Sequence, residues 1–326
     1  AAAGRLRQSG SEPVDIEPLA SHMAADVIFR TLFSIPIEHE TASRVYRLFR
    51  DYQRSQPILN LAAFVPLPGW MPRFFSRRTR QAAKEIRALI TDLTSARMAQ
   101  IEAGSAPDDL ATKIMTTVDP ETGNHFSTEE MVDQVAIFFL AGHETSASAL
   151  AWTLYLLAMY PEWQDKIAAE ASDLEEDFSQ IKKLRYTRDV FREGLRLYPP
   201  VPMMVRSTAR PETFRDRSAR PGSLCILSPW HMHRHKLLWS NPDEFDPWRW
   251  EDDATHNVAR DAFLPFSKGP RVCSGAGFAM LEGVLMLAML VRRFAWTTTD
   301  QVPVPVAHLT VRAEDGIRLR LTRRKP

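Results

Sequence analysis

The sequence predicts a mainly α-helical fold with a small β part, arranged as a single domain over residues 1–326. Three observations lead to this fold class. Amphipathic helical stretches fill the first half, a long apolar segment lies near the middle, and β-type alternation is confined to the last third. The composition, 44% hydrophobic and 25% charged, is typical of a globular protein. A formal net charge of +1 gives no support to a nucleic-acid partner.

Helical periodicity and end signals define the expected helices. Apolar residues recur at helical spacing over residues 18–34, 40–54, 77–102, 161–171, 187–198 and 276–293. The longest helix is expected over about 127–160, because Ser127 and Glu130 form a capping-box pattern and Pro161 ends the apolar run. This helix would be about 50 Å long and, being apolar on nearly all sides, should be buried.

Three other segments have distinctive patterns. The Pro-rich apolar stretch 56–75 forms either a mobile lid or a loop packed on the core, and both interpretations stay open. Residues 221–229 predict a short strand after a Pro-Gly turn. A hairpin is expected around Asp315 and Gly316, with alternating apolar residues on its two strands. These are Leu309 and Val311 on one strand, and Ile317, Leu319 and Leu321 on the other.

The loop 266–275, FSKGPRVCSG, carries the strongest chemical signal. A thiolate that ligates iron must lie on a rigid loop close to a flat macrocycle, and Gly269 and Gly275 permit that approach because they lack side chains. The helix that follows places its positive end near Cys273 and favours the thiolate. Arg271 can reach a carboxylate at the edge of a cofactor. From these residues alone, a glycine-containing turn with a buried cysteine remains the alternative.

Cys225 is the only other cysteine and lacks this sequence context, so it is interpreted as a packed residue. Two cysteines are too few for a disulfide framework and suit a reducing compartment.

The 266–275 loop resembles the haem-binding signature of the cytochrome P450 family, F-x-x-G-x-R-x-C-x-G. Its fixed positions are all present, as Phe266, Gly269, Arg271, Cys273 and Gly275. The resemblance implies the cytochrome P450 fold and a haem b cofactor with Cys273 as the axial ligand of the iron. It also implies a monooxygenase that inserts one atom of O2 into a small apolar organic substrate.

A second family element, A-G-x-E-T, lies in the long helix as Ala141, Gly142, His143, Glu144 and Thr145. Gly142 removes a side chain where a diatomic ligand needs room, and buried hydroxyl and carboxyl groups are costly unless they are used. In the family, the alcohol stabilises oxygen at the iron and the acid supplies protons. Thr145 and Glu144 match those roles by position, although alone such a pair indicates polar packing. His143 is interpreted as a packed or solvent-linked side chain.

A third family element, E-x-x-R, is present as Glu193 and Arg196, which share one helix face. The family combines this pair with a later arginine to brace the cysteine loop, and Arg249 occupies that position. The neighbouring Trp248 departs from the family, which usually has glutamate there. The expected role of the three charged residues is structural.

Residues after the E-x-x-R helix are expected near the cofactor and substrate. Arg206 resembles the family's partner for a haem propionate, with a surface arginine on a strand as the alternative. Val201, Met203 and Met204, together with Ala141, are expected to give the substrate pocket a soft apolar wall.

His231, His233 and His235 alternate in WHMHRH, a spacing that on a strand is compatible with a metal site. The family has a His-Arg step here without a metal, so no second metal site is expected.

Electrons are expected from a separate ferredoxin or flavoprotein reductase, because no flavin- or iron–sulfur-binding segment is visible. Lys268, Arg292 and Arg293 are candidates for docking an acidic donor. A non-enzymatic haem gas sensor and a peroxide-using haem-thiolate enzyme remain the alternative functions.

The start of the chain suggests a missing segment. The family usually begins with a longer region that includes most of one β-sheet and a helix beside the haem. Because this chain opens AAAGRLRQSG without a methionine, that region is expected to be absent. The chain is expected to be cytoplasmic and soluble, and a lost membrane anchor remains an alternative.

Overall fold

The structure, a computed structural model, describes residues 12–54, 76–119, 123–174 and 178–324. It is mainly helical with small sheets, which confirms the predicted fold class. The stretch 56–75, expected as a lid or packed loop, lies outside the described residues.

The expected helices are all present with closely matching limits, and three shorter helices over 110–116, 229–232 and 253–262 were not expected. The α-helices are α2 (Ile16–Phe33), α3 (Glu40–Arg54), α4 (Arg77–Glu102), α5 (Leu110–Thr116), α6 (Thr128–Met159), α7 (Pro161–Glu170), α8 (Arg185–Leu197), α9 (Pro229–Met232), α10 (Asp253–Ala262) and α11 (Ala276–Arg293). Short 3-10 helices occur as η2 (Phe178–Lys183), η3 (Pro247–Glu251) and η4 (Gly269–Arg271).

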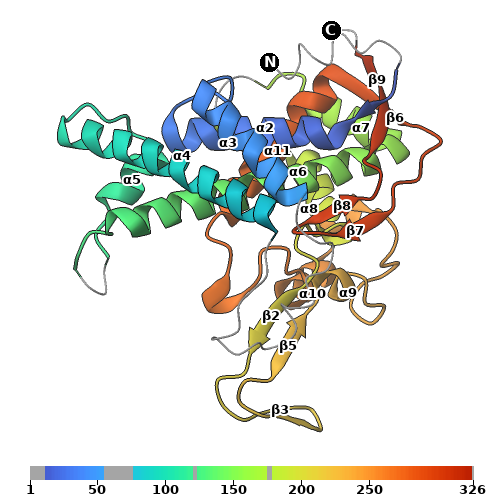
Figure 1. The fold of residues 1–326 in the computed structure, drawn as a ribbon. Coiled ribbons are helices and arrows are strands. Elements are labelled where there is room, and N and C mark those ends of the chain that lie inside the picture. Colours follow the sequence, from blue (N-terminus) through green and yellow to red (C-terminus); the bar gives the residue numbers. More distant parts are fainter. Residues whose placement is uncertain (1–11, 55–75, 120–122, 175–177, 325–326) are drawn as a thin grey trace.

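Helix α6 runs through the middle of the helical part and contacts α2, α4, α8 and α11 (Figure 1). Its predicted capping box forms, because the Ser127 amide donates to Glu130 Oε2 at 2.8 Å and the Glu130 amide donates back to Ser127 Oγ. From residue 146 to residue 158 every side chain is buried. The long apolar run therefore forms the central core helix that the sequence predicts.

The strands form four small sheets. A three-stranded sheet has the order β1 (Val14–Asp15), β9 (Arg318–Arg323) and β6 (Phe294–Thr298). Three antiparallel pairs complete the β part: β2 (Met204–Ser207) with β5 (Leu224–Leu227), β3 (Glu212–Phe214) with β4 (Arg217–Ala219), and β7 (Pro305–Ala307) with β8 (Val311–Ala313). In Figure 1 the β2–β5 pair extends away from the helical layer.

The predicted hairpin around Asp315 and Gly316 is wrong. Both flanking segments are strands, but β8 pairs with β7, whereas β9 pairs with β6 and β1. Strand β9 lies in the middle of its sheet, so both of its edges are occupied and β8 has no edge to join. Leu309, expected inside the hairpin, is exposed in the loop before β8.

The buried side chains form two main clusters. One joins the second half of α6 to α8, α11 and the three-stranded sheet. The other joins α2, α3 and α4 to the first half of α6. In the part of the chain that the structure describes, no helix has both the length and the apolar character needed to cross a membrane.

Candidate functional site

The Cys273 loop is held by short backbone hydrogen bonds. The Cys273 amide donates to the Phe266 carbonyl at 2.8 Å, and the Val272 amide donates to the Gly269 carbonyl at 3.0 Å. Gly269 has a φ of +74°, in the left-handed region that favours glycine, and open space lies where its Cβ would be. The Cys273 thiol itself is exposed. The loop therefore presents a thiol outward from a fixed backbone.

Helix α11 begins directly after this thiol. Gly275 is the residue before the first helical turn, and no side chain caps that end. The Ala276 amide donates to the Cys273 carbonyl at 3.3 Å, so the positive end of the helix lies beside this residue. This is the arrangement expected from the sequence. A Cβ on Gly275 would lie 3.8 Å from the Cys273 sulfur, an ordinary contact distance.

One stripe of α6 is open to solvent although most of the helix is buried. Ile137 and Ala141 are exposed and Thr145 is partly buried, and these residues follow one another at intervals of four. The Thr145 hydroxyl donates to the Ala141 carbonyl at 2.7 Å, so its lone pairs remain available to a group on the open side. The stripe is the part of α6 that can face a ligand.

Glu144 lies on a different face of α6 from Thr145. Its Oε1 accepts hydrogen bonds from Arg312 Nε at 2.7 Å and from the Thr310 hydroxyl at 3.0 Å. The carboxylate is buried, and Arg312 Nη2 lies 2.5 Å from the same oxygen. Neighbouring positions on a helix point about 100° apart, so the expected acid–alcohol pair is directed toward two different surroundings.

His143 is packed into the core, as the sequence analysis expected. Its ring stacks on Phe139 with centroids 5.6 Å apart, and its Nε2 lies 3.3 Å from the Ser21 hydroxyl. Burial lowers the pKa of His143 to about 4, while the nearby Glu144 carboxylate acts in the opposite direction. The ring is therefore neutral near pH 7.

Gly142 faces α2 and not open space. A Cβ built at Gly142 would lie 2.6 Å from Cδ1 of Ile28. The missing side chain lets α2 pack closely against α6. This packing accounts for a glycine at position 142, and its expected role in making room for a diatomic ligand stays a prediction.

A second buried carboxyl group links α6 to α11. Glu282 Oε2 accepts a hydrogen bond from the Ser146 hydroxyl at 2.8 Å, and Oε1 is fully buried without a hydrogen-bond partner. Burial raises the pKa of Glu282 to about 7, and the Ser146 hydrogen bond opposes this shift. Glu282 is thus a weak acid placed between the helix that carries Thr145 and the helix that follows Cys273.

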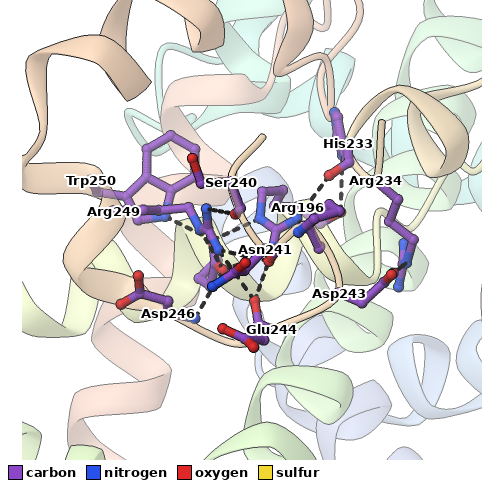
Figure 2. A network of polar contacts seen from close by, with 12 residues as sticks. Arg196, His233, Arg234, Ser240, Asn241, Asp243, Glu244, Asp246, Arg249 and Trp250 are labelled. Atoms are coloured by element: carbon purple, nitrogen blue, oxygen red, sulfur yellow. Dashed lines mark hydrogen bonds and ion pairs between the residues drawn. The ribbon is translucent and has the colours of Figure 1, made fainter. Parts of the chain in front are cut away.

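Glu193 lies in a buried ion network with two arginines. Figure 2 shows these arginines, Arg196 and Arg249, among the backbone segments that they contact. The two Glu193 oxygens accept from Arg196 Nη2 at 2.8 Å and Arg196 Nε at 2.9 Å, a bidentate pair. Arg249 Nε adds a third charge-assisted hydrogen bond at 2.9 Å, and the Trp250 indole donates at 3.2 Å. The structure therefore brings together the three charged residues that the sequence grouped. Trp248 is partly exposed beside Trp163, so the departure from the family at this position leaves the network intact.

The two guanidinium groups also fix the surrounding backbone. Arg196 donates to the carbonyls of His233, Pro242 and Glu244, and Arg249 donates to that of Ser240. Among the described residues, none of the three charged side chains hydrogen-bonds to the 266–275 loop. The network holds the segment before the loop, and its connection to the loop passes through His233. The His233 imidazole lies 3.1 Å from the Arg196 carbonyl and 2.8 Å from the Leu264 amide.

The other two histidines of the WHMHRH segment are exposed and make local contacts. His231 Nδ1 lies 2.8 Å from the Ser228 hydroxyl, and His235 accepts from the Leu237 amide. Because His233 is buried between α8 and the segment before the loop, the three rings have separate partners.

Arg206 lies beside the cysteine loop. It is on β2 opposite Cys225, and its Nη2 is 3.2 Å from the Ser267 hydroxyl.

Met203 lines a cavity of about 190 Å³ together with Trp230 and residues of β7. Val201, Met204 and Ala141 are not among the residues that line this cavity, so the structure does not gather the four predicted pocket residues around one space.

Three side chains with polar roles at this site were missed from the sequence. They are Arg312 and Thr310, which hold Glu144, and Glu282, which pairs with Ser146. Arg312 and Thr310 are far from Glu144 in sequence, and no local pattern connects them. Glu282 could have been identified from the sequence, because it is the single acidic residue within the apolar α11 sequence.

The chain offers iron a single cysteine ligand. Among residues 12–54, 76–119, 123–174 and 178–324, no three His, Cys, Asp or Glu side chains are grouped to hold a metal ion. Iron held by the Cys273 thiolate would take its other ligands from a cofactor such as haem, whose macrocycle supplies nitrogen ligands. The exposed thiol and the open stripe of α6 fit such a group.

Comparisons with known proteins agree with this interpretation. The profile of the cytochrome P450 family matches residues 3–319. Cytochrome P450 72A15 of Arabidopsis thaliana is 31% identical over 318 residues, or 94% of this chain and 61% of the relative. Cyclooctat-9-en-7-ol 5-monooxygenase of Streptomyces melanosporofaciens is 32% identical over 290 residues, or 86% of this chain and 61% of that protein. The chain thus spans about three-fifths of the length of these relatives.

Solved structures share the fold. The retinoic acid-bound cyanobacterial CYP120A1 has a TM-score of 0.85 and 26% identity, with 99% of this chain and 72% of that chain covered. A mutant of the cytochrome P450DA heme domain has a TM-score of 0.86 and 25% identity, with 100% and 72% covered.

The structure has a mainly helical fold and an exposed cysteine on the loop before α11. The chain belongs to the cytochrome P450 family. Membership in this family implies a haem cofactor.

Proposed function

We propose that the chain forms the haem-binding core of a monooxygenase that uses O2 to oxygenate a small apolar organic substrate. The observation that carries this proposal is the exposed Cys273 thiol on a loop held at the start of α11. The proposed cofactor is haem b, which when bound supplies the oxygen-activating iron. The relative named for oxygenation of cyclooctat-9-en-7-ol and the neighbour with bound retinoic acid support an apolar substrate.

Cys273, as the thiolate, is proposed to hold the cofactor, with Phe266, Gly269, Arg271 and Gly275 shaping the loop around it. Arg206 is proposed to pair with a haem propionate. Its guanidinium lies at the loop, 3.2 Å from the Ser267 hydroxyl, and would supply a charge-assisted hydrogen bond to a carboxylate of the cofactor.

Thr145 is proposed to accept a hydrogen bond from a group on the open stripe of α6, because its own proton is donated to the carbonyl of Ala141 one turn earlier. Glu144 is proposed to move protons from the opposite side of the helix. Its carboxylate is held by Arg312 and Thr310, so a proton passes to Thr145 only if the carboxylate rotates or water connects the two faces. Arg312 is therefore proposed to control the availability of this acid.

Glu193, Arg196 and Arg249 are proposed to act structurally, because all three are buried and the two guanidinium groups donate to backbone carbonyls of the segment before the cysteine loop. Ala141, Val201, Met203 and Met204 are proposed to contact substrate. The electron donor is proposed to be a separate ferredoxin or flavoprotein reductase, with Lys268, Arg292 and Arg293 at the docking surface. Lys268 is ion-paired with Asp261, so an acidic partner must compete with that contact.

The test supplies the haem-loaded protein with a surrogate reductase and a panel of apolar compounds. Monooxygenation predicts compounds that shift the haem absorption spectrum and products that contain one atom from isotopically labelled O2. Binding of diatomic gases without any substrate-induced shift or product would instead indicate a sensor. Product formation only with added peroxide would indicate a peroxide-using enzyme.

The substitution Thr145→Ala tests the proposed role of the Thr145 hydroxyl group. The variant should consume O2 but release more hydrogen peroxide per product, whereas Thr145→Ser should behave as the wild type. Thr153→Ala is the matched control, because Thr153 makes the same hydrogen bond to the carbonyl four residues earlier but is buried in the core. Equal coupling of reductant to product in all three variants would refute the role of Thr145.

A further inference from the structure

His233 is fully buried between the ion network and the segment that leads to the cysteine loop. Its ring lies 5.3 Å from that of Phe263, centroid to centroid, and 6.4 Å from that of Trp239. Both ring nitrogens have backbone partners, on α8 and on the segment after α10. The side chain is therefore fixed on all sides.

The two partners determine the tautomer. The Leu264 amide can only donate a hydrogen bond, so Nε2 accepts it at 2.8 Å and carries no proton. The Arg196 carbonyl can only accept, so Nδ1 carries the proton and donates at 3.1 Å. Burial lowers the pKa of His233 to about 3, with a further contribution from the Arg196 and Arg234 charges. The neutral Nδ1-H form is the one present at physiological pH.

The contact with Arg196 is reciprocal. The Arg196 side chain donates to the His233 carbonyl at 2.8 Å, while the His233 side chain donates to the Arg196 carbonyl. On the other side, Leu264 is two residues before Phe266, whose carbonyl accepts the Cys273 amide at 2.8 Å. A short path of hydrogen bonds and backbone thus leads from Glu193 through His233 to Cys273.

We propose that His233 is a positioning residue for the Cys273 loop. It acts by holding the Leu264 amide, and thereby the segment in which the loop begins. The inference rests on the proposed haem-thiolate function for its consequence at the iron. The hydrogen bond itself is independent of the cofactor.

Two substitutions separate the two hydrogen bonds. In His233→Asn the amide nitrogen takes the place of Nδ1, so the bond to Arg196 is kept and the bond to Leu264 is lost. In His233→Gln the amide oxygen reaches the place of Nε2, so the bond to Leu264 is kept. His235→Asn is the control, because it makes the same change on an exposed histidine two residues later.

The first measurement is hydrogen exchange of the Leu264 amide in the protein without haem. Loss of one buried hydrogen bond should speed this exchange about tenfold in His233→Asn. His233→Gln and His235→Asn should stay near the wild-type rate. The second measurement is the share of the reduced carbon monoxide complex that shows the red-shifted band of thiolate ligation. That share should fall in His233→Asn and remain high in His233→Gln.

Equal effects of the Asn and Gln substitutions would show a general packing role and overturn the proposal. Unchanged Leu264 exchange in His233→Asn would overturn it as well. A wild-type protein without the thiolate band would refute the haem-thiolate function instead. In that case the exchange measurement alone still decides whether His233 holds the loop.

Discussion

Replacing Glu282 by glutamine should raise the free energy of unfolding at neutral and alkaline pH. In the folded chain this carboxyl is buried beside Ser146, with one oxygen that has no hydrogen-bond partner. Burial raises its pKa from 4.5 to about 7. Each pKa unit corresponds to about 1.4 kcal/mol, so ionised Glu282 weakens the folded state by about 3 kcal/mol relative to the protonated form.

The raised pKa determines the pH window. The stabilising contribution of protonated Glu282 is complete below pH 4.5 and is lost as pH rises through 7, because the unfolded chain releases its proton first. Glutamine is neutral at every pH and keeps an oxygen to accept from Ser146. The stability difference between Glu282→Gln and wild type should therefore grow by about 3 kcal/mol between pH 4.5 and pH 8.

Urea unfolding of the protein without haem, followed by circular dichroism across this range, measures the difference directly. Glu314→Gln, which removes an exposed carboxyl group, controls for the change in net charge. A constant stability difference between Glu282→Gln and wild type across the range would refute the reasoning. It would mean that Glu282 is solvated in the folded protein.

Three further predictions concern packing, acid stability and the ion network. Gly283→Ala should destabilise by about 1–3 kcal/mol, because its Cβ would lie 2.1 Å from Phe191 Cζ, whereas Gly277→Ala on the same helix meets open space and should not destabilise. Urea titrations of both variants test this, and equal stabilities would contradict it. His143 has a pKa of about 4 in the folded chain, so its contribution is present above pH 6.5 and about 3 kcal/mol is lost as pH falls through 4. His143→Gln should remove that acid dependence, and an unchanged pH profile would count against it. Glu193→Ala should cost about 3–5 kcal/mol, because two buried guanidinium groups lose their anion, and a loss below 1 kcal/mol in thermal unfolding would disprove the network's importance.

Helix limits were predictable because periodicity and capping are local. The helices expected over 40–54, 77–102 and 276–293 have those limits in the structure, and the one expected over about 127–160 is Thr128–Met159. The capping box at Ser127 forms as predicted. Helices α5, α9 and α10 were missed, since each has ten residues or fewer and offers at most three turns of periodicity.

Strand pairing was not predictable from the same local signals. The alternating apolar residues of β8 and β9 and the Asp315-Gly316 turn favoured a hairpin. Neither feature indicates whether an edge of β9 is free to pair with β8. Pairing of β9 with β6 and β1 depends on strands at both ends of the chain.

Among the site residues, too, some features were predictable from the sequence and others were not. The grouping of Glu193, Arg196 and Arg249 followed from the family motif and is present in the structure. The direction of each side chain within the α6 motif did not follow from sequence. Gly142 faces Ile28, and Glu144 faces Arg312, because the packing of α2 and β8 around α6 decides which face meets which neighbour.

The most direct test of the account replaces Cys273 by serine in the haem-loaded protein. The wild type, reduced and exposed to carbon monoxide, should show the red-shifted band of thiolate ligation, and Cys273→Ser should lose it. Cys225→Ser is the matched control, since Cys225 is a half-buried thiol on β5 and its loss should leave the band unchanged. A Cys273→Ser protein that retained the band would contradict the assignment of Cys273 as the iron ligand.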